Sequence, residues 1–541
     1  MLDTPRPAGA AARHSRRRVV GGLTATLAAG ALPATGADAQ SATPVATTNE
    51  GQPLPAAVTA IMRRAPYAPF TQWGIYVADR ASGEAIYALN AEQRYVPGST
   101  TKLFPAAAAL AAYGPDYRFQ TPVYTRGALQ DGVLDGELVL VASGDITMGG
   151  RDLPDGTLAY GTIDHTDANA APGFGTYVEA DPLAGLNALA EQVAAAGITQ
   201  ANDVIIDARL WPQTPKDSYV LSPIMINDNV LDLITTPGQP GAPASLTWRP
   251  ETAAFTVRTE AVTVGSDEPL QLSVASPANG EVVVHGQVPA GSEPILLVYE
   301  VQDPPAFART LFIEALQRQG VRILATATGP NPEQELAPGE TFADEDQVAR
   351  LTSLPFSEVI KVILKVSLNA GADTLIFLLA LKAGSDTFQD GLIAIRPFLG
   401  AIGVDPADIS LGDGRGNDRS DLFSPRAVGD LLRAMADQPE YPEFAAALPI
   451  LGVDGTEWTA LPPTSPALGQ ISGKSGTTIA YDLMNESFMA LGKATAGYMT
   501  ARSGRELVWA IYVNDVLGSL ADLLAIGDDI GEMAEAIWAA Q

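Results

Sequence analysis

The 541-residue sequence predicts a mixed α/β protein of the α+β type, in which strand patterns and helix patterns share one core. Residues 74–79 and 85–89 are two short apolar runs joined by a Ser82-Gly83 turn, which is typical of a strand pair. Residues 507–514 form a third strong strand pattern. Near the C-terminus, apolar residues recur every three or four positions from Leu523 to Ile537, which predicts an amphipathic helix covering one face of the sheet.

The texture of the sequence changes over roughly residues 121–347, where short β-like runs alternate with Gly, Pro and Asp. Runs such as 138–141 and 281–284 predict strands, and a helical pattern at 305–319 lies near the end of this stretch. Helical patterns return after residue 350, over 356–382 and 425–436. We therefore expect a domain whose two parts are separated by inserted, strand-rich material.

The composition argues for an exported protein that does not bind nucleic acid. The net charge is −29, and such an acidic surface disfavours binding to nucleic acid or anionic lipid. The chain has no cysteine, so no thiolate nucleophile exists. Residues 1–39 have a basic start, an apolar run over 19–32 and a small-residue cleavage site, which predicts a signal peptide. The run around Arg16-Arg17 resembles a twin-arginine export signal. Residues 40–51 are expected to be a linker, and no later run predicts a membrane segment.

The stretch with the clearest chemistry is Ser99-Thr100-Thr101-Lys102, at the head of an apolar run that predicts a helix. A helix would place Ser99 and Lys102 one turn apart on the same face. A serine hydroxyl becomes a useful nucleophile when a neighbouring base takes its proton, and a partly desolvated lysine amine can do this. Pro105 is expected to cause a kink or a short first turn, since it lacks a backbone N–H.

Other catalytic arrangements are disfavoured by what the chain lacks. Beyond His14 in the predicted signal peptide, the histidines are His165 and His285, for which structural or surface roles are expected, so neither a Ser-His-Asp triad nor a zinc peptidase is favoured. The Gly473-Lys474-Ser475 run is not a P-loop, because the motif needs a glycine where Leu468 stands. No metal and no cofactor are expected.

Three short motifs occur in the order that is the signature of penicillin-binding proteins and class A β-lactamases. They are Ser99-x-x-Lys102, Ser367-x-Asn369 and Lys474-Ser475-Gly476-Thr477. In that chemistry Ser99 attacks an acyl carbonyl, Lys102 takes its proton and Ser367 relays a proton to the leaving amine. Asn369 holds the substrate amide, and the Lys474 motif binds a carboxylate. Backbone N–H groups of Ser99 and Thr477 would form the oxyanion hole.

With these motifs the chain resembles the D-alanyl-D-alanine carboxypeptidase/endopeptidase family of low-molecular-mass class C penicillin-binding proteins, the S13 serine peptidases. The resemblance runs from about residue 52 to the C-terminus. Further family-like runs are 117–121, Gly144-Asp145, 451–456 and Ala496-Gly497-Tyr498. The departures are Leu368, Asp373, Arg415 with Asn417-Asp418, and Pro105, none of which removes a catalytic group.

The resemblance implies a β-lactamase/transpeptidase-like antiparallel sheet with helices on both sides, interrupted by two inserted domains. The implied division is 52–125 and 348–541 for the transpeptidase-like domain and 126–347 for the insertions, the inner one at roughly 213–300. The implied substrate is the D-Ala-D-Ala end of a peptidoglycan stem peptide, or a D-Ala-diaminopimelate cross-link, and β-lactams would be covalent inhibitors. A serine β-lactamase or esterase, or an idle cell-wall-binding protein, remain the alternatives.

Overall fold

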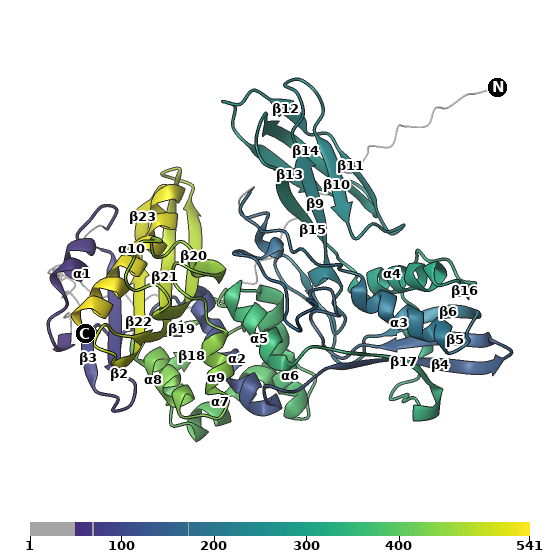
Figure 1. Cartoon of the computed structure of the whole chain (residues 1–541), viewed down its shortest axis with the longest axis horizontal. Helices are drawn as coiled ribbons and strands as arrows, with labels where there is room; N and C mark the ends of the chain where they lie inside the picture. Colours follow the sequence, from purple (N-terminus) through teal and green to yellow (C-terminus); the bar gives the residue numbers. More distant parts are fainter. Residues whose placement is uncertain (1–48, 68–69, 171–172) are drawn as a thin grey trace, which may run out of the picture. The chain divides into compact units, whose positions relative to one another are not determined.

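A computed structural model describes residues 49–67, 70–170 and 173–541, so the predicted signal peptide and most of the predicted linker lie outside the described residues. Its central feature is an antiparallel sheet with the strand order β1-β3-β2-β22-β21-β20, to which β23 adds by pairing with β21 (Figure 1). Its strands are β1 (Asn49–Gly51), β2 (Gln72–Asp79), β3 (Ala85–Leu89), β20 (Ile471–Asp482), β21 (Ser487–Thr500), β22 (Glu506–Asn514) and β23 (Val516–Gly518). Strands from both ends of the chain thus form one sheet.

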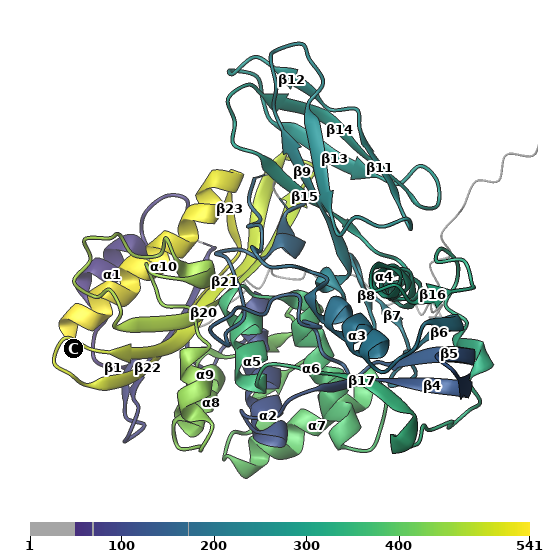
Figure 2. The same cartoon turned by 45° about the vertical axis from the view of Figure 1, so that its right-hand side comes forward.

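The two faces of this sheet are covered by different helices, because successive strand residues point to opposite sides. On β2, Ile75 and Val77 pack into the core shared with α1 (Ala56–Ile61) and α10 (Leu520–Ala540), and α10 crosses that face in Figure 2. Tyr76 and Ala78 pack into the opposite core with α2 (Leu103–Tyr113) and α8 (Pro425–Ala436). The predicted sheet with helices on both sides is confirmed.

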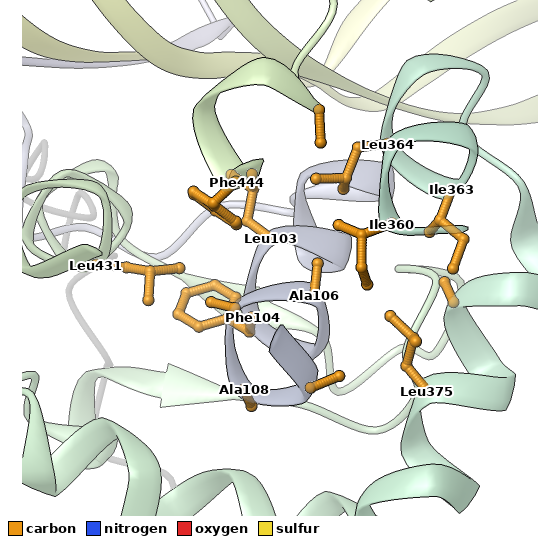
Figure 3. Close-up of a cluster of buried hydrophobic side chains, with 14 of the residues drawn as sticks. Leu103, Phe104, Ala106, Ala108, Ile360, Ile363, Leu364, Leu375, Leu431 and Phe444 are labelled. Atoms are coloured by element: carbon orange, nitrogen blue, oxygen red, sulfur yellow. The ribbon is translucent and has the colours of Figure 1, made fainter. Parts of the chain in front are cut away.

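Helix α2 is the centre of the larger core. All of its residues from Leu103 to Leu110 are buried, and four of them are alanines that let neighbouring helices approach closely. Figure 3 shows Leu103 and Phe104 among side chains of α5, α6, α8 and α9, such as Ile360, Leu375 and Phe444. The helix that follows Ser99 and Lys102 is therefore held on all sides.

The helix pattern at 356–382 is two helices in the structure, α5 (Phe356–Lys365) and α6 (Asn369–Lys382). Ser367 lies between them with a left-handed backbone, at φ +63°, so the chain turns at this motif. The other helices of this part are α7 (Phe388–Ala401) and α9 (Tyr441–Ala446), and its short strands are β18 (Ile409–Ser410) and β19 (Leu422–Phe423). No helix among the described residues is long and apolar enough to span a bilayer.

Residues 120–352 form further sheets. A mixed sheet has the order β16-β6-β5-β4-β17, and two smaller sheets contain β9–β15. Their bounds are β4 (Gln120–Gln130), β5 (Val133–Val141), β6 (Gln200–Asp207), β7 (Thr214–Pro215), β8 (Val220–Leu221), β9 (Val230–Thr236), β10 (Ser245–Arg249), β11 (Thr256–Thr259), β12 (Val262–Val264), β13 (Gln271–Ala275), β14 (Glu281–Pro289), β15 (Ile295–Glu300), β16 (Arg322–Ile323), β17 (Gln347–Thr352), α3 (Ala184–Ala195) and α4 (Pro304–Arg318). Leu311 and Phe312 of α4 share one core with β5 and β6.

Candidate active site

Ser99 and Lys102 lie on a 3-10 turn, η1 (Gly98–Lys102), that leads directly into α2. The Lys102 Nζ atom lies 2.6 Å from the Ser99 Oγ atom. The change from a 3-10 turn to an α-helix falls before Pro105, the third residue of α2, whose missing N–H therefore removes no hydrogen bond from the helix interior. The expected short first turn is confirmed.

Lys102 is fully buried and its ammonium is surrounded by uncharged oxygens. Besides Ser99 Oγ, Nζ donates to Asn369 Oδ1 at 2.8 Å and to the Arg415 carbonyl at 3.1 Å. Burial lowers the pKa of Lys102 to about 8, although Asp167, Asp373 and Asp413 act in the opposite direction. About a tenth of this lysine is therefore uncharged at pH 7, and the uncharged form is the one that can act as a general base.

The second motif reaches the same place from the start of α6. Asn369 is the first residue of that helix, and its Oδ1 atom is held by Lys102. Ser367 is half-buried and lines the same cavity as Ser99. Leu368, which differs from the family pattern, is buried in the core and faces away from the polar site.

The third motif lies on strand β20, directly against the serine turn. A methyl group added at Gly476 would lie 2.0 Å from the Pro97 carbonyl oxygen, and one added at Gly98 would lie 2.5 Å from the Thr477 nitrogen. Gly98 also has φ +51°, which favours glycine. Both glycines are thus required for β20 to approach η1, and the backbone N–H groups of Ser99 and Thr477 come close together as a result.

A cavity of about 350 Å³ opens over these motifs, lined among others by Ser99, Ser367, Asn369, Ser475, Gly476 and Thr477. Lys474 is fully buried and donates to the Ser475 carbonyl at 2.7 Å. Burial and the nearby Lys102 charge lower the pKa of Lys474 well below its ordinary value. Six of the eight predicted site residues therefore line the cavity, while Lys102 and Lys474 are fully buried.

Sequence reasoning missed several residues at this cavity. Thr456 lines it and its Oγ1 atom lies 3.0 Å from Ser475 Oγ. Asp167 lines it from the short turn η2 (His165–Asp167), and burial raises the pKa of Asp167 to about 6. Lys493 of β21 lines it as well. A family-like run at 451–456 already contained Thr456, but no local pattern marked Asp167 or Lys493.

The loop that departs from the family pattern is held by buried charged side chains, and its Asn417 lines the cavity. The Arg415 side chain is buried and pairs with Asp413, at 3.2 Å, and with Asp217, at 2.9 Å. Asp373 is fully buried and accepts hydrogen bonds from the Gly414 N–H and from Tyr219, both at 2.9 Å. The Arg415 side chain thus fixes the loop, and its carbonyl, not its charge, contacts Lys102.

One cluster has the composition of a metal site. Ligand atoms of Asp164, His165 and Asp228 lie within 4.8 Å of one another. However, Arg151 Nη2 already donates to Asp164 at 2.6 Å and to Asp228 at 2.7 Å, so a cation occupies the position between these carboxylates. His285 lies on β14 with 38% of its side chain exposed, beside Glu260. Both histidines therefore have the structural or surface roles expected from the sequence.

Comparison with known proteins agrees with this geometry. The model of the D-Ala-D-Ala carboxypeptidase 3 (S13) family matches residues 54–536. A D-alanyl-D-alanine carboxypeptidase of Actinomadura sp. (strain R39) is 28% identical over 489 residues, covering 84% of this chain and 80% of that protein. The D-alanyl-D-alanine carboxypeptidase DacB of Haemophilus influenzae is 24% identical over 444 residues, covering 77% of this chain and 80% of that protein. The crystal structure of penicillin binding protein 4 (dacB) from H. influenzae matches with a TM-score of 0.66 at 21% identity, covering 88% of this chain and 99% of that one.

Together, the fold and these matches define a serine peptidase of the penicillin-binding class. The chain belongs to the S13 family, and it is a D-Ala-D-Ala carboxypeptidase resembling penicillin binding protein 4. The family predicted from the three motifs is confirmed.

Proposed function

We propose that the carboxypeptidase reaction proceeds through an acyl-enzyme on Ser99, with Lys102 as the general base. The observation that carries this proposal is the 2.6 Å separation between Ser99 Oγ and a Lys102 amine that is fully buried and has a lowered pKa. Uncharged Lys102 takes the hydroxyl proton as Ser99 Oγ bonds to the carbonyl carbon of the penultimate D-Ala.

The rest of the cycle uses the groups that line the cavity. The tetrahedral oxyanion would be held by the N–H groups of Ser99 and Thr477, whose closeness the two glycines permit. The C–N bond then breaks, Ser367 passes the proton to the amine, and D-Ala leaves. Water attacks the acyl-enzyme and releases the shortened peptide, returning the proton to Ser99. The Nδ2 atom of Asn369 is proposed to bind the substrate amide, since Oδ1 is held by Lys102.

Ser475 and Thr477 are proposed to bind the terminal carboxylate of the substrate, together with the buried Lys474 of the same motif. We further propose export, directed by residues 1–39 and followed by the linker at 40–51, and action on peptidoglycan stem peptides. We propose a division into a transpeptidase-like domain (52–125 and 348–541) and inserted domains (126–347, the inner one at 213–300). The mixed sheet that includes β4 and β17 puts the outer boundaries a few residues away, near 120 and 352.

Endopeptidase cleavage of D-Ala-diaminopimelate cross-links is proposed as a second activity. In both reactions the carbonyl group that Ser99 attacks belongs to a D-Ala residue, and only the leaving amine differs. Incubation with purified muropeptides, followed by product mass measurement, tests it. Loss of one alanine mass shows carboxypeptidase action, and conversion of cross-linked dimers to monomers shows endopeptidase action. Dimers that survive while monomers are trimmed would contradict the second activity.

Penicillin sensitivity is the sharpest test of the proposed nucleophile. Penicillin binding protein 4 from H. influenzae has been solved in complex with a β-lactam, and it shares this fold at a TM-score of 0.62. A β-lactam presents a strained amide beside a carboxylate, so the proposed site should open its ring and retain the acyl group.

Intact-protein mass spectrometry should show one added drug mass, mapped to the peptide with Ser99 and absent in Ser99→Ala. An adduct on another residue would overturn the nucleophile. Rapid drug hydrolysis without an adduct would favour a β-lactamase, and neither adduct nor hydrolysis would favour an idle binding protein.

A further inference from the structure

Lys493 is a lysine at the active-site cavity that the three motifs do not include. It lies on β21, directly opposite Thr477 of β20 in the antiparallel register. Opposite residues in such a pair project from the same face of the sheet, and here the Lys493 Nζ atom donates to Thr477 Oγ1 at 2.9 Å. Both side chains line the cavity with Ser99.

The hydrogen bond has a direction that matters for binding. An ammonium has only donors, so Thr477 Oγ1 must accept from Lys493. The hydroxyl hydrogen of Thr477 is then free to be donated to a second acceptor. A carboxylate placed there would receive a hydrogen bond from Thr477 and lie beside the positive charge of Lys493.

The charge of Lys493 is not neutralised by a close partner. Among the described residues, no carboxylate lies within 4.0 Å of its Nζ atom, and the hydrogen bond it makes is to an uncharged hydroxyl. Burial lowers the pKa of Lys493, while Glu457 and Asp528 act in the opposite direction from farther away. Burial raises the pKa of both carboxyl groups. In a chain of net charge −29, a half-buried lysine without an ion pair at the mouth of a catalytic site favours an anionic ligand.

We infer that Lys493 is a specificity-determining residue, which together with Thr477 binds the terminal carboxylate of the substrate and orients the Thr477 hydroxyl toward it. The inference rests on the proposed function, since it assumes that Ser475 and Thr477 face that carboxylate. It adds a cation outside the three motifs. Lys474 is fully buried and bonded to a backbone carbonyl, whereas Lys493 is the lysine that lines the cavity.

The test compares an N-acylated peptide ending in D-Ala-D-Ala, as the free acid and as the C-terminal amide. The measured quantity is the ratio of kcat/KM for the acid to kcat/KM for the amide. In Lys493→Met this ratio should fall about tenfold or more, because a charge-assisted contact to the acid alone is lost. Lys493→Arg should keep most of the ratio, and raised salt should lower it in the wild type more than in Lys493→Met.

Lys382→Met, which removes an exposed lysine at the far end of α6, is the matched control and should leave the ratio unchanged. An unchanged ratio in Lys493→Met would overturn the inference and leave Lys493 as a counter-charge to Glu457 and Asp528. If Lys493→Met does not fold, Lys493→Gln replaces it under the same two outcomes.

Penicillin labelling of Ser99 in the same wild-type sample separates the two hypotheses. A labelled enzyme whose ratio does not respond to Lys493 overturns the inference alone. A wild-type enzyme that is not labelled, or that does not prefer the acid, overturns the proposed function itself.

Discussion

Two groups of buried charges in this protein have opposite surroundings. At the active site, Lys102 is fully buried and its hydrogen bonds go to uncharged oxygens of Ser99, Asn369 and Arg415. In residues 151–249, His165 is also buried, but its two ring nitrogens contact the carboxylates of Asp228, at 2.8 Å, and Asp232, at 2.6 Å.

The pKa values of the two residues move in opposite directions. Burial lowers the pKa of Lys102 to about 8. Burial would also lower the pKa of His165, but the carboxylates of Asp232, Asp164 and Asp228 outweigh it and raise the pKa to about 10. Burial alone therefore does not decide whether a cation becomes a base; the charge of its hydrogen-bond partners does.

The buried cluster around His165 is balanced when that residue is protonated. Arg151 pairs with Asp164 and Asp228, and Arg249 pairs with Asp232 at 2.8 Å. The three cations then match the three carboxylates. The cluster supports the turn η2, whose last residue, Asp167, lines the active-site cavity. Lys102 thus has no carboxylate among its hydrogen-bond partners, whereas His165, Arg151 and Arg249 are each paired with carboxylates that stabilise the fold.

Removing the uncompensated cation should have the largest effect. Lys102→Ala should lower the rate of acylation by penicillin by ~10²–10⁴-fold, because the general base is lost. The acylation rate can be measured by stopped flow or by mass spectrometry of samples quenched at set times. Circular dichroism shows whether the fold is retained. An acylation rate close to that of the wild type would refute the Ser99-Lys102 assignment.

Breaking the compensated cluster should instead reduce stability. Asp232→Asn removes the fully buried carboxylate that pairs with His165 Nδ1 and with Arg249, so that two carboxylates remain for three cations. The free energy of unfolding should fall by ~3–5 kcal/mol in denaturant titrations.

Glu260→Gln is the control for this change, since Glu260 pairs with Arg258 and His285 on the exposed surface. It should leave the unfolding midpoint unchanged. Equal effects of the two substitutions would show that the buried cluster does not contribute to stability as its geometry indicates.

In the wild-type enzyme, raising the pH should increase the acylation rate through Lys102 and decrease the free energy of unfolding through His165. Lys102 must be uncharged to act, so the acylation rate should rise about tenfold per pH unit below its pKa of about 8 and then level. The folded pKa of His165, about 10, is above its ordinary value of 6.5, so its stabilising contribution is complete below 6.5 and is lost as the pH rises through 10.

Acylation rates and unfolding free energies measured over one pH series test both directions. His165→Gln should remove much of the loss of stability with rising pH without moving the midpoint of the acylation profile. A midpoint that moves with this substitution would mean that the two charge clusters are coupled.

Much of the fold was predictable because its signals are local. The short apolar runs of β2 and β22, the Ser-Gly turn before β3 and the apolar spacing of α10 each follow from a few neighbouring residues. The proposed catalytic motifs are local as well, so the sequence predicts Ser99 and Lys102 from the three motifs in their order. The break at Ser367 was not predicted, because its left-handed backbone depends on how α5 and α6 pack.

The sequence by itself determined the family, the order of the motifs and the residue types needed for acyl transfer. Only the tertiary structure decided which distant residues surround them. Lys493 meets Thr477 through the register of β20 and β21, and Asp167 reaches the cavity from an inserted segment. The lowered pKa of Lys102 depends likewise on its complete burial in the folded chain. The physical reason is that burial, charge and hydrogen-bond partners are properties of the folded chain, and spacing along the sequence does not record them.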